Sequence, residues 1–473
     1  MTQQIASDAQ ANGFRRSLTL LDGTMLVAGT MIGSGIFIVS ADIVRTTGSA
    51  GYLILVWLIS GFMTVAGALS YAEFAGMFPK AGGQYVYLRE AWGKLPAFLY
   101  GWSFFAVIQT GSIAAVGVAF AKFTAYLVPS LGDANVLLQV GGFRLTAAQL
   151  VAIAVVLTLT FVNARGVNYG KWIQTVFTLA KIGAVLALIG FGLLLGANAD
   201  VWQANWAQAW QRTAATPEGL ALALLPAIAV SMVGALFSSD SWHSAASVAD
   251  EIRHPRRNVG LSLFLGTVLV CSLYLVANLM YLAVLPLDGI AHAESDRVGV
   301  AAAQAAFGSW GTGLIAVLIM VSTFGCVNGL VLAGARVYYS MARDGLFFAR
   351  AGNLNRNAVP GWGLWLQALW ACVLCLSGRY GDLLDYVILA TLIFYVMTIA
   401  GLFRLRRTRP DLERPYRAFA YPVLPALYIV FASAIGVGLL IWKPAYTWPG
   451  LVIVLLGVPV FYLLRGRSAR TPD

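Results

Sequence analysis

The stretch GTMIGSGIF, residues 29–37, decides the expected fold, because three glycines crowd a segment that is otherwise apolar enough to cross a membrane. Glycine costs a helix about 1 kcal/mol relative to alanine, and lipid cannot satisfy the backbone groups that a broken helix frees. We therefore expect a broken transmembrane helix whose break faces protein, water or a ligand, with helix ends that can bind charged groups. The alternative is that the glycines only let another helix pack closely.

The composition predicts a membrane protein. The chain has 473 residues, of which 59% are hydrophobic and 11% charged, whereas a soluble domain carries about 25% charged residues. Apolar runs near the ~20 residues that span a bilayer recur about twelve times. We predict spans at residues 18–44, 51–78, 95–127, 146–163, 172–196, 219–248, 258–285, 308–341, 361–377, 383–403, 419–441 and 447–464. The fold class is thus an all-α polytopic membrane protein with about 12 transmembrane helices.

The net charge of +11 follows the predicted topology. With the N-terminus in the cytoplasm, the inner segments hold most Lys and Arg, including the cluster from Arg404 to Arg417. The outer loops then hold only Arg45, Arg144, Arg212, Arg297, Arg379 and Lys443. This bias predicts a multi-pass protein of the cytoplasmic (inner) membrane with both termini in the cytoplasm. The basic residues indicate contact with membrane lipid and not with nucleic acid. Residues 1–14 lack the apolar core of a signal peptide, so the first span serves as the insertion signal.

A second interruption lies in the sixth predicted span, at residues 237–244 (FSSDSWHS). Short polar side chains offer the backbone alternative hydrogen bonds, and Asp240 is an acid at about mid-membrane depth. The separation of the two interruptions is that of a five-span unit repeated with inverted topology. No residue identity relates the two halves, so this interpretation rests on position.

Polar residues inside other spans are further candidates. Lys181 lies two to three turns inside the fifth span, where a lysine costs at least ~2.5–3.5 kcal/mol unless carbonyls, hydroxyls or water receive it. We favour a functional role over snorkelling to the membrane surface. Ser322, Thr323 and Asn328 in the eighth span can bind an ion or can hydrogen-bond the backbone. Gln109, Thr110 and Ser112 in the third span either line a pathway or join helices.

Other features favour structural roles. Glu73, near the inner end of the second span, is expected to pair with a neighbouring arginine. Cys372 and Cys375 form a C-x-x-C pair that we interpret as two buried small side chains. With only three histidines and no nucleophile motif or nucleotide loop, we expect no metal, no cofactor and no enzyme activity.

Several stretches carry a family resemblance when they are taken together. They are GTMIGSGIF at 29–37, YAE at 71–73 followed by PKAGG at 79–83, LPAFL at 95–99, FTLAK at 177–181, STFGCVNG at 322–329 and ARDG at 342–345. These stretches resemble the L-type amino-acid transporters (LAT-like) of the amino acid, polyamine and organocation (APC) superfamily. The resemblance covers about the first ten spans and implies a LeuT-like five-plus-five inverted repeat with two additional C-terminal helices.

The resemblance divides the chain into five parts and implies a site. The parts are a cytoplasmic tail at 1–14, repeats at 15–200 and 201–410, two additional helices at 411–465 and a cytoplasmic tail at 466–473. Backbone N–H groups and a hydroxyl at the first break would bind a substrate carboxylate, namely at Ile32, Gly33, Ser34 and Gly35. Carbonyls at the second break would bind the α-amino group, namely at Phe237, Ser238 and Asp240. Phe237 would be the aromatic gate.

The resemblance also bears on coupling and partners. Lys181 matches the lysine that takes the sodium position of sodium-coupled relatives, and we group Ser322, Thr323 and Asn328 with it. Family members usually have small residues in place of Asp240 and Ser241, and many have asparagine in place of His243, which we keep as a binding candidate. The carboxylate could favour a second cationic group, or be protonated or tied to a neighbouring donor. The loop at 128–145 has no cysteine for a disulfide-linked heavy subunit, so the chain is expected to work alone.

The expected function is therefore that of a sodium-independent transporter that exchanges L-amino acids, small neutral ones favoured, by alternating access. The alternative within transport is proton-coupled uptake, or transport of cationic amino acids or polyamines, with Lys181 or Asp240 as the proton carrier. The alternative of another class is an amino-acid sensor that binds without transport.

Overall fold

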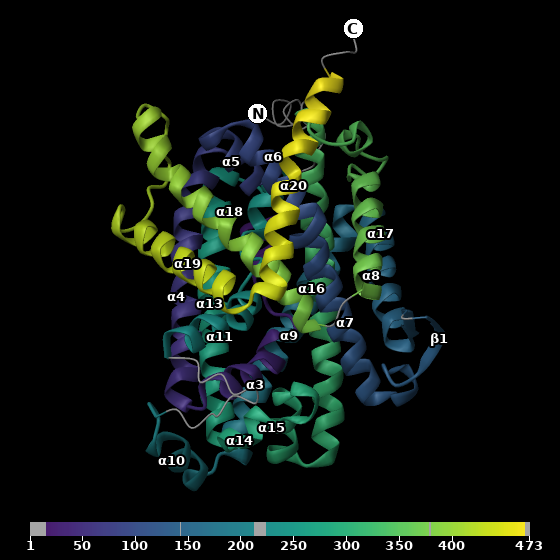
Figure 1. Cartoon of the computed structure of the whole chain (residues 1–473), viewed down its shortest axis with the longest axis vertical. Helices are drawn as coiled ribbons and strands as arrows, with labels where there is room; N and C mark the ends of the chain where they lie inside the picture. Colours follow the sequence, from purple (N-terminus) through teal and green to yellow (C-terminus); the bar gives the residue numbers. More distant parts are fainter. Residues whose placement is uncertain (1–15, 142, 212–223, 378–379, 469–473) are drawn as a thin grey trace.

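The computed structural model describes residues 16–141, 143–211, 224–377 and 380–468, and most of them are helical. Within these ranges the strands are β1 (Val136–Val140) and β2 (Phe143–Thr146), which form one antiparallel hairpin. Eight of the described helices are long and apolar enough to cross a membrane, and a ninth span results when one bent pair is counted together. The predicted class, an all-α polytopic membrane protein, is confirmed (Figure 1).

Within the described residues the predicted spans coincide with helices or with helices joined end to end, and residues 219–223 of the sixth predicted span lie outside the described residues. These are α2 (Leu20–Met31) with α3 (Gly35–Thr47), α4 (Ala50–Met77), α6 (Lys94–Ser103) continued by η1 (Phe104–Ile108) and α7 (Gln109–Leu127), α8 (Ala147–Ala164), α9 (Val167–Phe191), α11 (Leu224–Ser238), α13 (Pro255–Val284), α16 (Ser309–Arg343), α17 (Gly361–Ser377), α18 (Tyr380–Thr408), α19 (Val423–Trp442) and α20 (Pro444–Ser468). Apolar segments in α11, α17 and α20 are shorter than the other spans, so the count of twelve stays a prediction.

Shorter elements mark the two ends of the bundle. At one end lie α5 (Gln84–Trp92) and the last turns of α20, and at the other lie α10 (Ala199–Ala207), α14 (Leu287–Ala291) and α15 (Val298–Phe307) (Figure 1). Basic side chains gather at the α5 end, where Arg409 lies 3.0 Å from Glu90 of α5 and Arg256 lies 2.9 Å from Glu413. In the predicted topology this end faces the cytoplasm, and that orientation stays a prediction.

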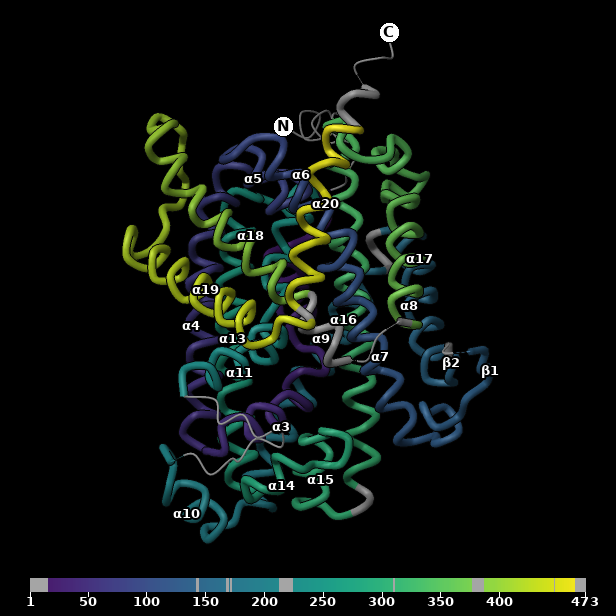
Figure 2. Tube along the Cα trace, viewed as in Figure 1, coloured from purple at the N-terminus to yellow at the C-terminus, as the bar shows by residue number. Residues whose placement is uncertain are grey.

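Two helix breaks form the centre of the bundle. Helices α2 and α3 meet at an angle of 41°, and α11 ends at Ser238, before the short helix α12 (Ser244–Ser247). Helix α3 packs against α11, α4 against α13, and α7 against α16, and the first two of these pairs can be followed in Figure 2. Such pairing of corresponding helices fits an inverted repeat, whose boundaries stay a prediction.

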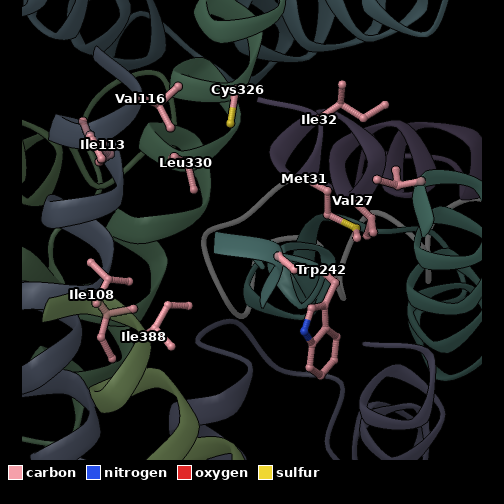
Figure 3. Packing of buried hydrophobic residues seen from close by; sticks show 14 of the residues in the cluster. Val27, Met31, Ile32, Ile108, Ile113, Val116, Trp242, Cys326, Leu330 and Ile388 are labelled. Atoms are coloured by element: carbon pink, nitrogen blue, oxygen red, sulfur yellow. The ribbon is translucent and has the colours of Figure 1, made fainter. Parts of the chain in front are cut away.

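Local sequence explains where α2 begins. The Thr19 hydroxyl accepts a hydrogen bond from the Asp22 N–H group, and the Asp22 carboxylate accepts one from the Thr19 N–H group 2.8 Å away. This capping box satisfies two backbone donors that would otherwise lack a partner. The other end of α2 packs in the core, where Val27, Met31 and Ile32 lie in the same buried cluster as Trp242 (Figure 3).

Glu73 has the structural role that the sequence favoured. Its side chain is fully buried on α4 and accepts hydrogen bonds from Arg406 at 3.0 and 2.6 Å and from the N–H group of Ala418 at 2.7 Å. Arg414 lies 3.3 Å away. Glu73 therefore joins α4 to the end of α18 and to the segment before α19. Cys372 and Cys375 are free cysteines on α17, where Cys375 is buried as interpreted and Cys372 is only partly buried.

Replacing Glu73 with glutamine should destabilise the fold. The change removes a buried anion from two arginines, and breaking a buried pair costs about 3–5 kcal/mol. We expect the apparent melting temperature of the detergent-purified protein to fall. Glu413→Gln is the control, because that carboxylate is 71% exposed and an exposed pair contributes about 0–1 kcal/mol. Equal melting temperatures for the two variants would contradict the assigned role of Glu73.

Candidate functional site

A small cavity lies between the two helix breaks, where the sequence placed a binding site. Its lining combines both breaks with residues from α7 and α16. The lining residues are Thr30, Met31, Gly33, Ser34, Gly35, Ser112, Val116, Phe237, Ser238, Asp240, Ser241, Cys326 and Leu330. Six of the eight predicted substrate-binding residues thus meet around one space. The remaining two, Ile32 and His243, lie close by but outside this lining.

The first break is held by Lys181, which reaches it from α9. The fully buried ammonium group donates to the carbonyl oxygens of Gly29 at 2.5 Å, Ile32 at 2.9 Å and Ser322 at 3.2 Å. An ammonium group has three N–H donors, so these carbonyls match its full donor capacity. Lys181 therefore supplies a fixed positive charge to backbone oxygens that the break has freed, and it does not snorkel.

Helix α16 supplies further partners to the first break. The hydroxyl of Ser322 lies 3.1 Å from the Ile32 carbonyl and 3.3 Å from that of Gly33. The thiol of Cys326 donates to the Thr30 carbonyl at 3.0 Å. The carbonyls at the end of α2 thus face donors from α9 and α16. The N-terminal turn of α3 leaves N–H groups without intrahelical partners, as every helix does, and such a turn attracts anions.

The two breaks approach each other closely because of a glycine. A Cβ atom built on Gly35 would lie 2.0 Å from the Ser238 hydroxyl oxygen and 3.0 Å from the Ser238 Cα atom. A methyl group has no room there. From α13, the Tyr274 hydroxyl lies 2.9 Å from the Met31 carbonyl and 3.2 Å from the Ser238 carbonyl. Tyr274 therefore joins the two breaks, a role that the sequence analysis missed.

The second break contains a strained residue and a polar chain. Ser241 has a φ of +64°, a conformation that favours glycine, and its carbonyl accepts hydrogen bonds from Thr30 and Ser244. Tyr395 of α18 donates to the Asp240 carboxylate at 2.5 Å, and its oxygen lies 2.9 Å from Nδ1 of His243. Asp240, His243 and Tyr395 are all buried. The sequence allowed Asp240 to bind a cationic group, to be protonated or to pair with a neighbouring donor. The structure shows such a donor, the Tyr395 hydroxyl.

The other predicted coupling residues lie away from the cavity. Thr323 donates within α16, to the Ile319 and Met320 carbonyls. Asn328 donates to the Gly170 carbonyl and to Gln174, and accepts from Asn163. Of the two roles considered for these side chains, hydrogen bonding between and within helices is the one observed. Asn328 joins α16 to α8 and α9.

Several lining residues were not predicted from the sequence. Thr30, Met31, Val116, Cys326 and Leu330 were not singled out, although the first two lie directly beside the glycine break. For Ser112 the sequence allowed two roles, lining a pathway or joining helices. In the structure Ser112 lines the cavity, and its hydroxyl donates to the Ile108 carbonyl at 2.7 Å. Tyr395 carried no sequence signal, since an isolated tyrosine in an apolar span is common.

The chemistry of the cavity suits a small zwitterion. A helix N-terminus and the Ser34 hydroxyl offer donors for a carboxylate. Carbonyls at the end of α11 and the Asp240 carboxylate offer acceptors for an ammonium group. The Phe237 and Ser238 carbonyls already accept from Asp240 N–H and from Tyr274, and a carbonyl oxygen has a second lone pair. Among the described residues no group of three His, Cys, Asp or Glu side chains could hold a metal ion.

Comparisons with known proteins agree on one family. The sequence profile of the family described as Amino acid permease matches residues 18–461. The chain is 28% identical to the b(0,+)-type amino acid transporter 1 of Mus musculus, over 97% of this chain and 90% of that protein. It is 29% identical to the serine/threonine exchanger SteT of Bacillus subtilis (strain 168), over 97% and 99% respectively. It is 28% identical to the Asc-type amino acid transporter 1 of Homo sapiens, over 95% and 82%.

Proposed function

Because the chain belongs to the amino acid permease family, we propose that it is a sodium-independent exchanger of L-amino acids that works by alternating access. The observation that carries the proposal is the cavity between the two breaks, which brings Gly33, Ser34, Gly35, Phe237 and Ser238 together around one space. Donors on one side and acceptors on the other match the carboxylate and the ammonium group of an amino acid. Phe237 is the aromatic gate of this proposal.

Sodium independence follows from Lys181. Its ammonium group lies among three carbonyl oxygens of the first break and α16, at 2.5 to 3.2 Å. Backbone carbonyls at a broken helix are the ligands that a transporter offers to a sodium ion. The Lys181 ammonium group therefore takes the place that a sodium ion would occupy among these oxygens. We therefore assign Lys181 and Ser322 to holding the first break together during transport.

Exchange and a small neutral substrate are supported by two further points. The relatives named above include a serine/threonine exchanger. The cavity is small, and Gly33, Gly35 and Ser34 form part of its wall, so substrates such as alanine, serine or threonine fit this proposal best. The protein acts in the cytoplasmic membrane with both termini in the cytoplasm, as the basic α5 end supports. It works without a disulfide-linked subunit, since the loop at 128–145 has no cysteine.

The test is uptake of labelled L-alanine and L-serine by the purified protein in liposomes. The account expects uptake when the lumen holds unlabelled amino acid and little uptake without it. Replacing sodium with choline should change nothing. Strict dependence on external sodium would contradict the role of Lys181. Binding of an amino acid without any uptake would favour the sensor, and no uptake or binding of any amino acid would overturn the proposal.

A second candidate substrate class is supported by Asp240, whose carboxylate lines the cavity. An acidic wall can receive a second ammonium or guanidinium group, as a cationic amino acid or polyamine would bring. In a thermal-shift assay, Asp240→Asn should need about tenfold more L-lysine or diamine than the wild type to reach the same rise in melting temperature. Stabilisation by L-alanine should remain. Asp288→Asn is the control, because that side chain is 89% exposed. Equal lysine effects for both variants would contradict this candidate.

A further inference from the structure

The three residues Asp240, Tyr395 and His243 form a hydrogen-bonded chain that amino-acid binding alone does not require. The Tyr395 oxygen lies 2.5 Å from the Asp240 carboxylate and 2.9 Å from Nδ1 of His243. The chain connects the second break to α18. His243 takes part in it without lining the substrate cavity.

The surroundings of Asp240 are acidic or neutral. The titratable groups near it are Tyr71 from α4, Tyr100 from α6, Tyr274 from α13, Cys326 from α16 and Tyr428 from α19, besides Tyr395 and His243 of the chain itself. Lys181 of α9 is the buried cation of the first break, and its ammonium group is engaged by three carbonyls outside the cavity lining. Asp240 thus has no basic side chain among its hydrogen-bond partners in the described part of the chain.

An ionised carboxylate in such surroundings is costly unless a cation or a proton neutralises it. A neutral amino acid brings one positive and one negative group and leaves this need unmet. A cationic amino acid brings an additional positive group and meets it. We propose that Asp240, Tyr395 and His243 form a proton-binding site that carries one proton with each neutral amino acid and none with a cationic one. This inference rests on the proposed exchange function.

The proton inventory of the chain balances in both states. A tyrosine hydroxyl has one proton to donate. When Asp240 is ionised, Tyr395 donates to it, and Nδ1 of His243 carries a proton that it donates to the Tyr395 oxygen. When a proton binds the carboxylate oxygen of Asp240 that Tyr395 does not contact, the carboxyl group becomes neutral, and Tyr395 and His243 keep their protons.

A second small cavity shares Asp240 with the substrate cavity. It is lined by Thr64, Ser239, Asp240, Thr391, Tyr395 and Tyr428 together with apolar residues. Hydroxyl groups of this kind can hold water in a protein interior. Asp240 therefore borders both the substrate cavity and a hydroxyl-lined space, and Tyr395 borders the second space. This arrangement gives the proton a place to exchange that does not compete with the substrate.

The test uses the full-length protein in liposomes with a pH-sensitive dye in the lumen. With L-lysine inside and L-alanine outside, exchange should acidify the lumen by about one proton per alanine, because lysine leaves without a proton. With the two amino acids interchanged, the lumen should become alkaline. With L-alanine on both sides, exchange should leave the luminal pH unchanged. Alanine–lysine exchange without proton movement, or no exchange of lysine, would overturn the inference.

Variants separate the chain from a merely structural role. Tyr395→Phe removes the hydroxyl that stabilises the ionised carboxylate, so the pH at which alanine uptake falls to half should rise by about one unit. Tyr338→Phe is the control, since the Tyr338 hydroxyl is buried on α16 without a hydrogen-bond partner in the described part of the chain and Tyr338 lines neither cavity. An unchanged profile for Tyr395→Phe would overturn the inference. Absence of alanine uptake by the wild-type protein would instead overturn the exchange function itself.

Discussion

Replacing Lys181 with methionine is expected to abolish most amino-acid exchange, with a loss of about 100-fold in rate. The variant leaves the Gly29, Ile32 and Ser322 carbonyls without their ammonium partner. Each buried group left unsatisfied costs about 1–3 kcal/mol, whereas 1.4 kcal/mol already changes an equilibrium tenfold. The first break should lose its geometry, and the substrate carboxylate should lose its donors. Labelled alanine exchange in liposomes measures the effect.

One control variant and one stability measurement accompany this result. Lys94→Met removes an exposed lysine at the start of α6 and should leave exchange unchanged. The apparent melting temperature of Lys181→Met should fall as well, because the lost contacts join α9 to α2 and α16. Exchange by Lys181→Met within about twofold of the wild type would contradict the role assigned to this residue.

Replacing Gly35 with alanine is expected to reduce exchange by about 10- to 100-fold. The added Cβ atom would lie 2.6 Å from the Cβ atom and 3.0 Å from the Cα atom of Ser238, so the backbone of one break must move away from the other. Forcing an additional methyl group into packed surroundings costs about 1–3 kcal/mol. The displacement falls directly on the walls of the substrate cavity. Alanine exchange in liposomes, compared at equal protein content, measures it.

Gly61→Ala on α4 is the control, because Gly61 lines neither cavity. Its added Cβ atom would lie 3.4 Å from the Cys271 Cβ atom, an ordinary contact. Exchange by this variant should stay within about threefold of the wild type, and its melting temperature should stay close to the wild-type value. A loss in Gly61→Ala as large as that in Gly35→Ala would contradict the close approach of the two breaks.

Much of the fold could be predicted from the sequence, because the bilayer imposes a simple length rule. A span needs about 20 apolar residues, and the predicted ranges coincide with the helices, including the break after Met31. The break was predictable because glycine and short polar residues are costly inside an apolar span. Apolar segments slightly shorter than this length were harder to assign as spans. The apolar part of α20 runs from Thr447 to Leu463, and this helix contains Pro449 and Pro459.

The candidate site was predictable where its residues are unusual for a membrane span. A lysine, an aspartate and clustered glycines in apolar helices indicate function, and Lys181, Asp240 and Gly35 all lie at the breaks. Tyr274 and Tyr395 were missed because a tyrosine is ordinary in a span, and only the packing of α13 and α18 brings their hydroxyls to the breaks. Thr323 and Asn328 were grouped with the coupling residues from their position in the chain, and their hydrogen bonds face other helices.

The central claim is that the cavity between the breaks is the substrate site, and alkylation of Cys326 tests it most directly. Cys326 lines the cavity, and replacing Cys271, Cys372 and Cys375 with serine leaves it as the only cysteine of the chain. With this variant in liposomes and active in exchange, the account predicts that a small thiol reagent modifies Cys326 and that transported L-alanine slows the reaction. Modification at the same rate with and without the transported amino acid, or no modification at all, would contradict it.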